Sequence, residues 1–259
     1  MIRQKKQLSQ IFLKESWPCI AVVDFLKAQS VEHVLEIGPG SGQLTKILLE
    51  NNLKVTAVEK DERYADLLQQ SIDNPNFTVI NQDILKFNIK EWIGSSSQSK
   101  AICGNIPYHI STPILTSMFA WLKLIKCSCL LVQLEFAERL VAKENIKSYG
   151  SLSVYAQLRS EVTLEHVVDK TCFTPVPKID SALVSFLPKR NKEDLEILKK
   201  VEKLSKLAFS QRRKKLKNSI KPLLNEKLIE NCPIDLSRRC ETLSPEEFVQ
   251  LAKIVFDIA

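Results

Sequence analysis

The sequence predicts an α/β protein, in which a domain with a mostly parallel, doubly wound sheet precedes a small all-helical C-terminal domain. From Val34 onward, short apolar runs of strand length alternate with segments whose apolar residues recur every three or four positions, a pattern typical of such sheets. After Pro188 the chain becomes strongly charged and its apolar spacing is helical throughout. We therefore predict one domain over residues 1–188 and a second over residues 189–259.

The individual elements follow from the same spacing. Residues 1–33 are expected to form a basic arm and then a helix, whose apolar stripe is Ile20, Val22, Val23 and Leu26. Strands are expected at residues 34–37, 54–58, 77–80, 100–103 and 129–133. Helices are expected at residues 44–51, 61–72, 113–124 and 193–208. Because ligands of such sheets bind beyond the carboxyl ends of the strands, the side chains that follow these strands are the candidate site residues.

The composition favours a globular protein with an anionic partner. The formal net charge is +7 and 44% of the residues are hydrophobic, although charge alone leaves open a basic enzyme with a small-molecule substrate. Seven cysteines occur without a C-x-x-C pair, which favours free thiols in a reducing cytoplasm over a zinc ribbon. The three histidines lack metal-ligand spacing, and no apolar run reaches the ~18 residues of a membrane span. We expect a cytoplasmic protein without a metal site or a membrane partner.

A glycine-rich loop follows the strand expected at residues 34–37. Gly38, Gly40 and Gly42 permit a tight turn before the next helix, whose N-terminus favours negative charge. A dinucleotide fingerprint needs glycine or alanine where Gln43 stands. The spacing E-x-G-x-G-x-G, which starts at Glu36, instead resembles motif I of the Rossmann-like S-adenosylmethionine methyltransferases. The loop therefore favours a methyltransferase over a dehydrogenase.

Two acidic residues follow the next two strands. Glu59 stands 21 positions after Gly38 and is suited to chelate the ribose hydroxyls of a cofactor. Asp83 follows the third strand, where its carboxylate can accept a hydrogen bond from the adenine amino group of the cofactor. The alternatives are a solvated acid at position 59 and a helix or turn cap at position 83.

The tetrapeptide Asn105-Ile106-Pro107-Tyr108 follows the fourth strand and carries the candidate chemistry. The N6 lone pair of adenine is delocalised into the ring and is a poor nucleophile. The side-chain oxygen of Asn105 and the main-chain carbonyl of Ile106 can accept both amino hydrogens, which steers N6 toward pyramidal geometry. Pro107 fixes the turn, and Tyr108 offers a face on which a flipped base can stack. The quartet resembles the (N/D/S)-P-P-(Y/F) signature of amino-group methyltransferases, with an ordinary strand-ending turn as the alternative.

A basic segment lies in the predicted helical domain. Residues 199–221 contain ten Lys or Arg residues and one acid, Glu202. Such clusters bind phosphates, although a solvated helix face is the alternative. The densest run is the predicted RNA-binding set, Arg212, Arg213, Lys214 and Lys215. Three cations of the N-terminal arm, Arg3, Lys5 and Lys6, could extend the basic surface.

Further segments resemble one family, the small-subunit ribosomal RNA adenine N6,N6-dimethyltransferases, from Gln10 to about Asn218. The matching segments are residues 10–13, 105–113, 133–140, 149–153, 173–182 and 209–218. The resemblance implies that S-adenosylmethionine is held by Ile11, Leu13, Gly38, Gly40, Glu59, Asp83 and Asn105. It implies a catalytic pocket of Asn105, Ile106, Pro107 and Tyr108, with Phe173 as a second stacking face.

The resemblance also implies a substrate. The target would be two adjacent adenosines in a hairpin loop near the 3′ end of small-subunit rRNA, within the assembling small ribosomal subunit. We expect the enzyme to be a monomer. A large-subunit rRNA methylase of the antibiotic-resistance type, a DNA adenine methylase and a non-catalytic RNA-binding factor on the same fold are the alternatives.

Three positions depart from the family pattern. Ile11 replaces a polar Asn or His, so a side-chain hydrogen bond to the cofactor is lost and only a backbone contact is expected there. His109 replaces Asn after the tetrapeptide, and Leu134 replaces a basic residue. None of these changes removes the catalytic quartet.

Overall fold

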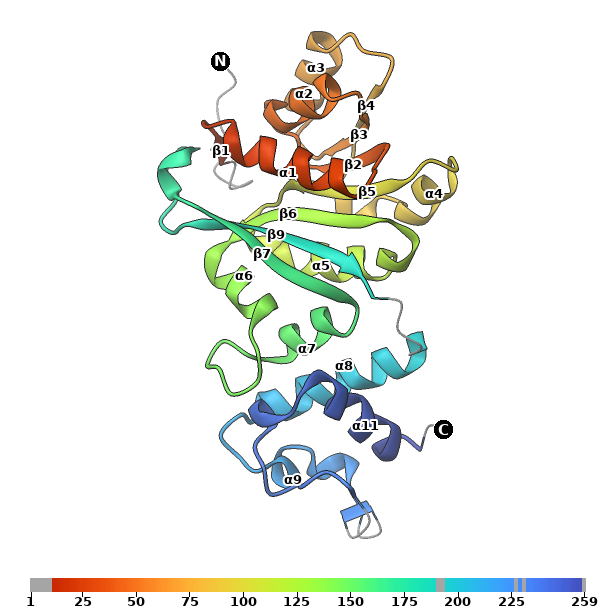
Figure 1. Cartoon of the computed structure of the whole chain (residues 1–259), viewed down its shortest axis with the longest axis vertical. Helices are drawn as coiled ribbons and strands as arrows, with labels where there is room; N and C mark the ends of the chain where they lie inside the picture. Colours follow the sequence, from red (N-terminus) through yellow and green to blue (C-terminus); the bar gives the residue numbers. More distant parts are fainter. Residues whose placement is uncertain (1–10, 190–193, 226–227, 230–231, 258–259) are drawn as a thin grey trace. The chain divides into compact units, whose positions relative to one another are not determined.

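The computed structural model describes residues 11–189, 194–225, 228–229 and 232–257 (Figure 1). The chain forms two compact units, one of residues 1–137 with 163–188 and one of residues 138–162 with 189–259. The chain passes into the second unit after Pro188, while residues 138–162, which the sequence analysis left in the first domain, also belong to the second unit. The division into functional domains at residue 188 stays a prediction.

The first unit is built on a seven-stranded sheet with the strand order β4-β3-β2-β5-β6-β9-β7. The pairs that join β4 through β6 are parallel, and β9 runs antiparallel to β6. The strands are β2 (His33–Ile37), β3 (Lys54–Glu59), β4 (Phe77–Asn81), β5 (Lys100–Asn105), β6 (Cys127–Gln133), β7 (Ser160–Val168) and β9 (Ser181–Pro188). The mostly parallel sheet of the predicted α/β fold is therefore confirmed.

Helices connect the parallel strands, as short apolar strands with helical crossovers require. The connecting helices are α2 (Gln43–Glu50), α3 (Glu62–Ser71), α4 (Ile89–Gly94) and α5 (Ser111–Phe119). Two further helices flank this set, α1 (Trp17–Ala28) before β2 and α6 (Leu134–Val141) after β6. The helix expected at residues 113–124 ends at Phe119 and is followed by a separate 3-10 turn at Leu122–Leu124. In α1 the predicted apolar stripe is buried except at Ile20, which is 46% exposed.

Both faces of the sheet are covered. Successive side chains of a strand point to opposite faces, and neighbouring residues of the strands are buried on both. Val34, Val55 and Cys129 belong to a core cluster that includes residues of α1 and α2. The neighbouring residues Leu35 and Ile102 are also fully buried. This explains why the strand sequences are continuous apolar runs.

A two-stranded sheet joins the start of the described chain to a segment far along it. The strand β1 (Phe12–Leu13) pairs antiparallel with β8 (Phe173–Thr174), with Leu13 opposite Phe173. The main-chain N–H of Lys14 continues the contact by donating to the carbonyl of Cys172 at 2.7 Å. The residues around β1 are thereby held beside the main sheet.

The second unit has a core of its own, built from α7 (Ser151–Gln157), α8 (Leu195–Ser210), α9 (Leu216–Ser219) and α11 (Pro245–Val255). Tyr149 is buried within it, and its hydroxyl donates to the carbonyl of Leu243 at 2.8 Å. Ser244 and Glu247 form a capping box at the start of α11. None of the helices that the structure describes is both long and apolar enough to cross a bilayer.

Candidate active site

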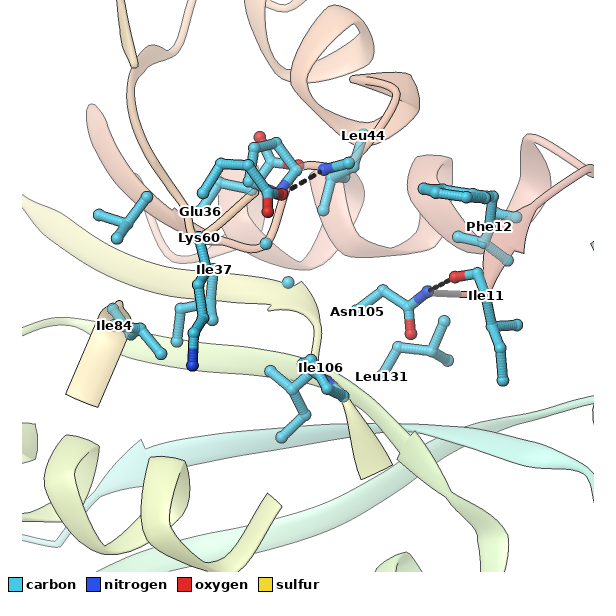
Figure 2. A pocket seen from close by; sticks show the side chains of 18 of the residues that line it. Ile11, Phe12, Glu36, Ile37, Leu44, Lys60, Ile84, Asn105, Ile106 and Leu131 are labelled. Carbon is cyan, nitrogen blue, oxygen red and sulfur yellow. Dashed lines mark hydrogen bonds between the residues drawn. The ribbon is translucent and has the colours of Figure 1, made fainter. Parts of the chain in front are cut away.

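A cavity opens at the carboxyl ends of β2, β3 and β5, the edge at which ligands of such sheets bind. Ten of the predicted site residues line this cavity. They are Ile11, Leu13, Gly38, Gly40, Glu59, Asp83, Asn105, Ile106, Pro107 and Tyr108. They come from segments spread over about a hundred residues of sequence, and several of them converge in Figure 2. The Gln10 of the N-terminal motif and the cations of the basic arm lie outside the described residues.

The glycine loop shapes one wall of the cavity. Gly40 has a φ of +53°, a left-handed backbone conformation that glycine adopts readily. A Cβ at this position would lie 2.6 Å from the ring of Phe12, so a larger residue would collide with β1. The main-chain N–H of Gly40 donates to the Glu59 carboxylate at 3.0 Å, which ties the loop to the end of β3.

Glu59 is oriented by two main-chain donors. One carboxylate oxygen accepts from the N–H of Gly40 and the other from the N–H of Asp61, at 2.8 Å. Burial raises the pKa of Glu59 above its ordinary value, and these hydrogen bonds oppose the rise. A carboxylate oxygen can accept two hydrogen bonds, so the group can still receive two ribose hydroxyls.

Glu36 adds a second buried acid to the cavity wall. Its carboxylate accepts a hydrogen bond of 2.7 Å from the hydroxyl of Thr45 on α2. Burial raises the pKa of Glu36 to about 7. The glycine-loop pattern pointed to Glu36, but nothing in the sequence singled out Thr45, because their contact depends on how α2 packs against β2.

Asp83 caps a turn and also lies at the cavity, so the two roles that the sequence left open are compatible. Its carboxylate accepts from the N–H of Leu85 at 3.0 Å, which caps a 3-10 turn, and the residue also lines the cavity. Lys60 donates to the other carboxylate oxygen at 2.8 Å. This contact is the main reason why the pKa of Asp83 lies below its ordinary value. Lys60 lines the cavity as well and was not among the predicted site residues.

Asn105 lies at the end of β5, beside β1. Its side-chain nitrogen donates to the main-chain carbonyl of Ile11 at 3.1 Å, the dashed line between these two residues in Figure 2. Among the described residues no donor contacts the amide oxygen, so it remains an acceptor, the function that the sequence analysis assigned to it. The apolar Ile11 thus takes part through its backbone.

The rest of the quartet forms the turn after β5. Ile106 is buried, and its main-chain N–H donates to the carbonyl of Leu131 at 3.2 Å. Pro107 caps a 3-10 turn that begins with Tyr108. The Tyr108 hydroxyl shares a hydrogen bond of 2.7 Å with that of Ser181, and burial raises its pKa. Ser181 fixes the orientation of the Tyr108 ring, a function that sequence analysis missed.

Phe173 is not among the residues that line the cavity. Its side chain is 0% exposed and belongs to the core cluster of the sheet. Through the pairing of β8 with β1, Phe173 supports the segment that carries Ile11. Its function as a second stacking face stays a prediction, and it would require the ring to leave this core.

The predicted RNA-binding residues lie in the second unit. Arg213, Lys214 and Lys215 are exposed. Arg212 is different, because its guanidinium donates to the carboxylate of Glu241 and, at 2.6 Å, to the carbonyl of Lys147. The structure therefore gives Arg212 a position in which it ties three segments of this unit together.

The cavity fits S-adenosylmethionine through its chemistry. Glu59 can accept from a ribose diol, Asp83 from an adenine amino group, and the glycine loop admits close approach of a ligand to the backbone. The buried Glu36 carboxyl, whose pKa is raised to about 7, can supply negative charge to a cationic ligand when it ionises. Beyond these groups lies Asn105, whose amide oxygen can accept from a second, nucleophilic amine.

Comparisons with known proteins agree with this chemistry. The family model described as "Ribosomal RNA adenine dimethylase" matches residues 1–257. The chain is 37% identical over 258 residues to the "Ribosomal RNA small subunit methyltransferase A" of Francisella tularensis subsp. novicida, covering 98% of both chains. It is 39% identical over 252 residues to the protein of the same name from Chlorobium phaeobacteroides, covering 97% of this chain and 94% of the relative.

Two solved structures share the fold. A dimethyladenosine transferase from Plasmodium falciparum superposes with a TM-score of 0.74 at 24% identity, over 93% of this chain and 95% of the other. The 23S rRNA methyltransferase ErmE superposes with a TM-score of 0.70, also at 24% identity, over 95% and 99%. The match to the family model covers nearly the whole sequence, and the cavity holds the residues that the chemistry needs. The chain belongs to the ribosomal RNA adenine dimethylase family and is an S-adenosylmethionine-dependent methyltransferase of rRNA adenines.

Proposed function

We propose that this enzyme dimethylates N6 of two adjacent adenosines in a hairpin loop near the 3′ end of small-subunit rRNA. It acts as a monomer in the cytoplasm, on the assembling small ribosomal subunit. The observation that carries the proposal is the orientation of Asn105, whose nitrogen is held by the Ile11 carbonyl and whose oxygen is left to accept from an amine. The names of the Francisella and Chlorobium relatives support the small subunit as the substrate.

The chemistry depends on how the residues hold the target amine. The Asn105 side-chain oxygen accepts one amino hydrogen and the Ile106 carbonyl accepts the other, so that the N6 lone pair is directed at the methyl group. The bound cofactor supplies that methyl group from a sulfonium. Tyr108, fixed by Ser181, stacks on the flipped base. Positioning of this kind provides much of the rate acceleration, because little acid–base assistance is needed.

RNA affinity is assigned to Arg213, Lys214 and Lys215. These three cations are exposed on the second unit, and among the residues that the structure describes their side chains have no hydrogen-bond partner to give up on contact with phosphates. Arg212 instead anchors the same turn through its contacts with Glu241 and Lys147. Binding should therefore be strongly dependent on salt.

Competition between the two ribosomal subunits tests the substrate. Unmethylated small and large subunits are offered together with methyl-labelled S-adenosylmethionine, and the labelled RNA is separated by size. We expect label in the small-subunit RNA alone, at two adjacent positions when modification is mapped by primer extension. Label in the large-subunit RNA would replace this proposal by the resistance-type activity. RNA binding without label in either would favour a non-catalytic assembly factor.

A further inference from the structure

Lys60 lies at the cavity but has no part in the proposed methyl transfer or in RNA binding. It follows Glu59 at the end of β3, and its side chain lines the cavity beside Asp83. Its ammonium group donates to one oxygen of the Asp83 carboxylate at 2.8 Å. Figure 2 shows the Lys60 side chain extended on the side of the cavity where Ile84 lies. The Lys60 side chain is 58% exposed and that of Asp83 is 21% exposed, so the pair lies at the rim of the cavity.

The Asp83 carboxylate keeps acceptor capacity while it is held. One oxygen accepts from the N–H of Leu85 and the other from Lys60. Each carboxylate oxygen can accept two hydrogen bonds, so a further donor can bind without displacing either partner. The two contacts at opposite oxygens fix the plane of the group. The hydrogen bond from Lys60 also lowers the pKa of Asp83, which keeps the carboxylate ionised.

We propose that Lys60 is a positioning residue for cofactor recognition, whose ammonium group holds the Asp83 carboxylate so that it accepts the amino group of the cofactor's adenine ring. Lys60 itself bonds to Asp83 and not to the reacting atoms. A rotating carboxylate would lose entropy on binding the amino group, whereas a held one has already lost it. The inference rests on the assignment of Asp83 to the adenine amino group, and it does not depend on which rRNA is the substrate.

Calorimetric titration with S-adenosylhomocysteine, in the absence of RNA, tests the proposal. The variant Lys60→Met keeps the aliphatic stem and removes the charge and the donor. We expect its affinity to fall about two- to fivefold at low ionic strength, the range of a largely exposed ion pair, and the difference to shrink at high salt. The pKa of Asp83 should rise in this variant. As the pH is lowered, its affinity for S-adenosylhomocysteine should therefore begin to fall at a higher pH than that of the unaltered protein.

A second probe isolates the amino group. The 6-unsubstituted purine analogue of S-adenosylhomocysteine lacks the amino donor, and the ratio of the two affinities measures what that group contributes. Lys60→Met should lower this ratio. An unchanged or larger ratio would overturn the proposal, because Lys60 would then act only through general charge or compete with the adenine for Asp83.

Two further variants keep the result specific. Lys86→Met removes another exposed cation that lowers the pKa of Asp83 through charge alone, and it should leave the amino-group ratio unchanged. In an Asp83→Asn background, Lys60→Met should have little further effect. If Lys86→Met reproduces the loss, or if Lys60→Met weakens binding equally without the Asp83 carboxylate, the positioning role is wrong. Thermal unfolding of each variant confirms that it is folded.

Discussion

At the scale of single residues, Asn105 shows how one amide can serve the fold and the chemistry at once. Its nitrogen bonds to the carbonyl of Ile11, a residue 94 positions earlier in the chain, and its oxygen stays available to the substrate. The departure of Ile11 from the polar family pattern therefore leaves this contact intact. Only the side chain at position 11 has changed, and the contact is made by the main chain.

Replacing Asn105 by Ala should lower the rate of methyl transfer by about two to three orders of magnitude, as loss of a hydrogen bond made to the reacting group does. Binding of S-adenosylhomocysteine and of RNA should change far less. Ile11→Ala is the matched control, since it retains the carbonyl that Asn105 contacts, and it should keep most of the activity. Single-turnover methylation and calorimetry separate the two effects. Comparable turnover by Asn105→Ala would remove the proposed role of this residue.

Glu36 should make stability depend on pH. Burial raises its pKa from the ordinary value to about 7, so between these values the folded protein holds a proton that the unfolded chain releases. The free energy of unfolding must therefore fall as the pH rises through this window, by at most roughly 3 kcal/mol from this group. Glu36→Gln keeps an acceptor for Thr45 and should flatten the dependence. Urea unfolding from acidic to neutral pH measures it, and equal slopes in both proteins would contradict the assignment.

At the scale of elements, we assign two different functions to the four consecutive cations in the basic turn after α8, internal hydrogen bonding and contact with phosphates. The guanidinium of Arg212 donates inward to Glu241 and to the carbonyls of Ile146 and Lys147. Arg213 follows it directly in sequence and is exposed. The sequence could not separate these residues, because a run of like charges carries no information about which side chain points inward.

Replacing Arg212 and Arg213 by Ala should therefore have different effects, the first on stability and the second on RNA binding. Arg212→Ala should lower the free energy of unfolding by about 1–3 kcal/mol, because it removes the arginine donor from the Glu241 carboxylate and the Lys147 carbonyl. Arg213→Ala should leave stability within about 0.5 kcal/mol and reduce the salt dependence of RNA binding by nearly one unit of log–log slope. Denaturant unfolding and RNA titration at several salt concentrations measure both. Equal destabilisation, or an unchanged salt slope for Arg213→Ala, would be inconsistent with this division.

Whether an element of the fold could be predicted depends on how far apart in the sequence the residues that define it lie. The parallel strands and three of their connecting helices (α2, α3 and α5) could be predicted because apolar spacing is read within ten or so residues, whereas the short α4 was not among the predicted helices. The antiparallel pairing of β9 with β6 and the union of β1 with β8 could not, since they join segments separated by about 50 and 160 residues, for which spacing gives no signal. Phe173 is an example, because its sequence motif could be identified but its burial against the main sheet could not be predicted.

Close approach of the backbone is another feature that spacing does not reveal. At Gly104, immediately before Asn105, a Cβ would lie 2.4 Å from the carbonyl oxygen of Ile37, and φ is +153°. Only glycine allows β5 to pass so near β2 at the point where the cavity begins. The sequence placed a strand here but gave no reason for glycine at its end.

At the scale of the whole molecule, the first unit contains the cofactor cavity and the catalytic quartet, and the second unit contains the exposed cations. Each unit has its own apolar core. Membership of the ribosomal RNA adenine dimethylase family covers both units, because the family model matches residues 1–257. The two sets of residues should thus act on one RNA molecule.

Nucleoside analysis of RNA methylated by the purified enzyme tests the central claim most directly. Unmethylated small ribosomal subunits are incubated with labelled S-adenosylmethionine, and the RNA is digested and separated by liquid chromatography with mass detection. We predict N6,N6-dimethyladenosine as the final product, at two nucleosides per subunit. Label in another nucleoside, or no label under conditions in which the cofactor and the subunit both bind, would contradict it.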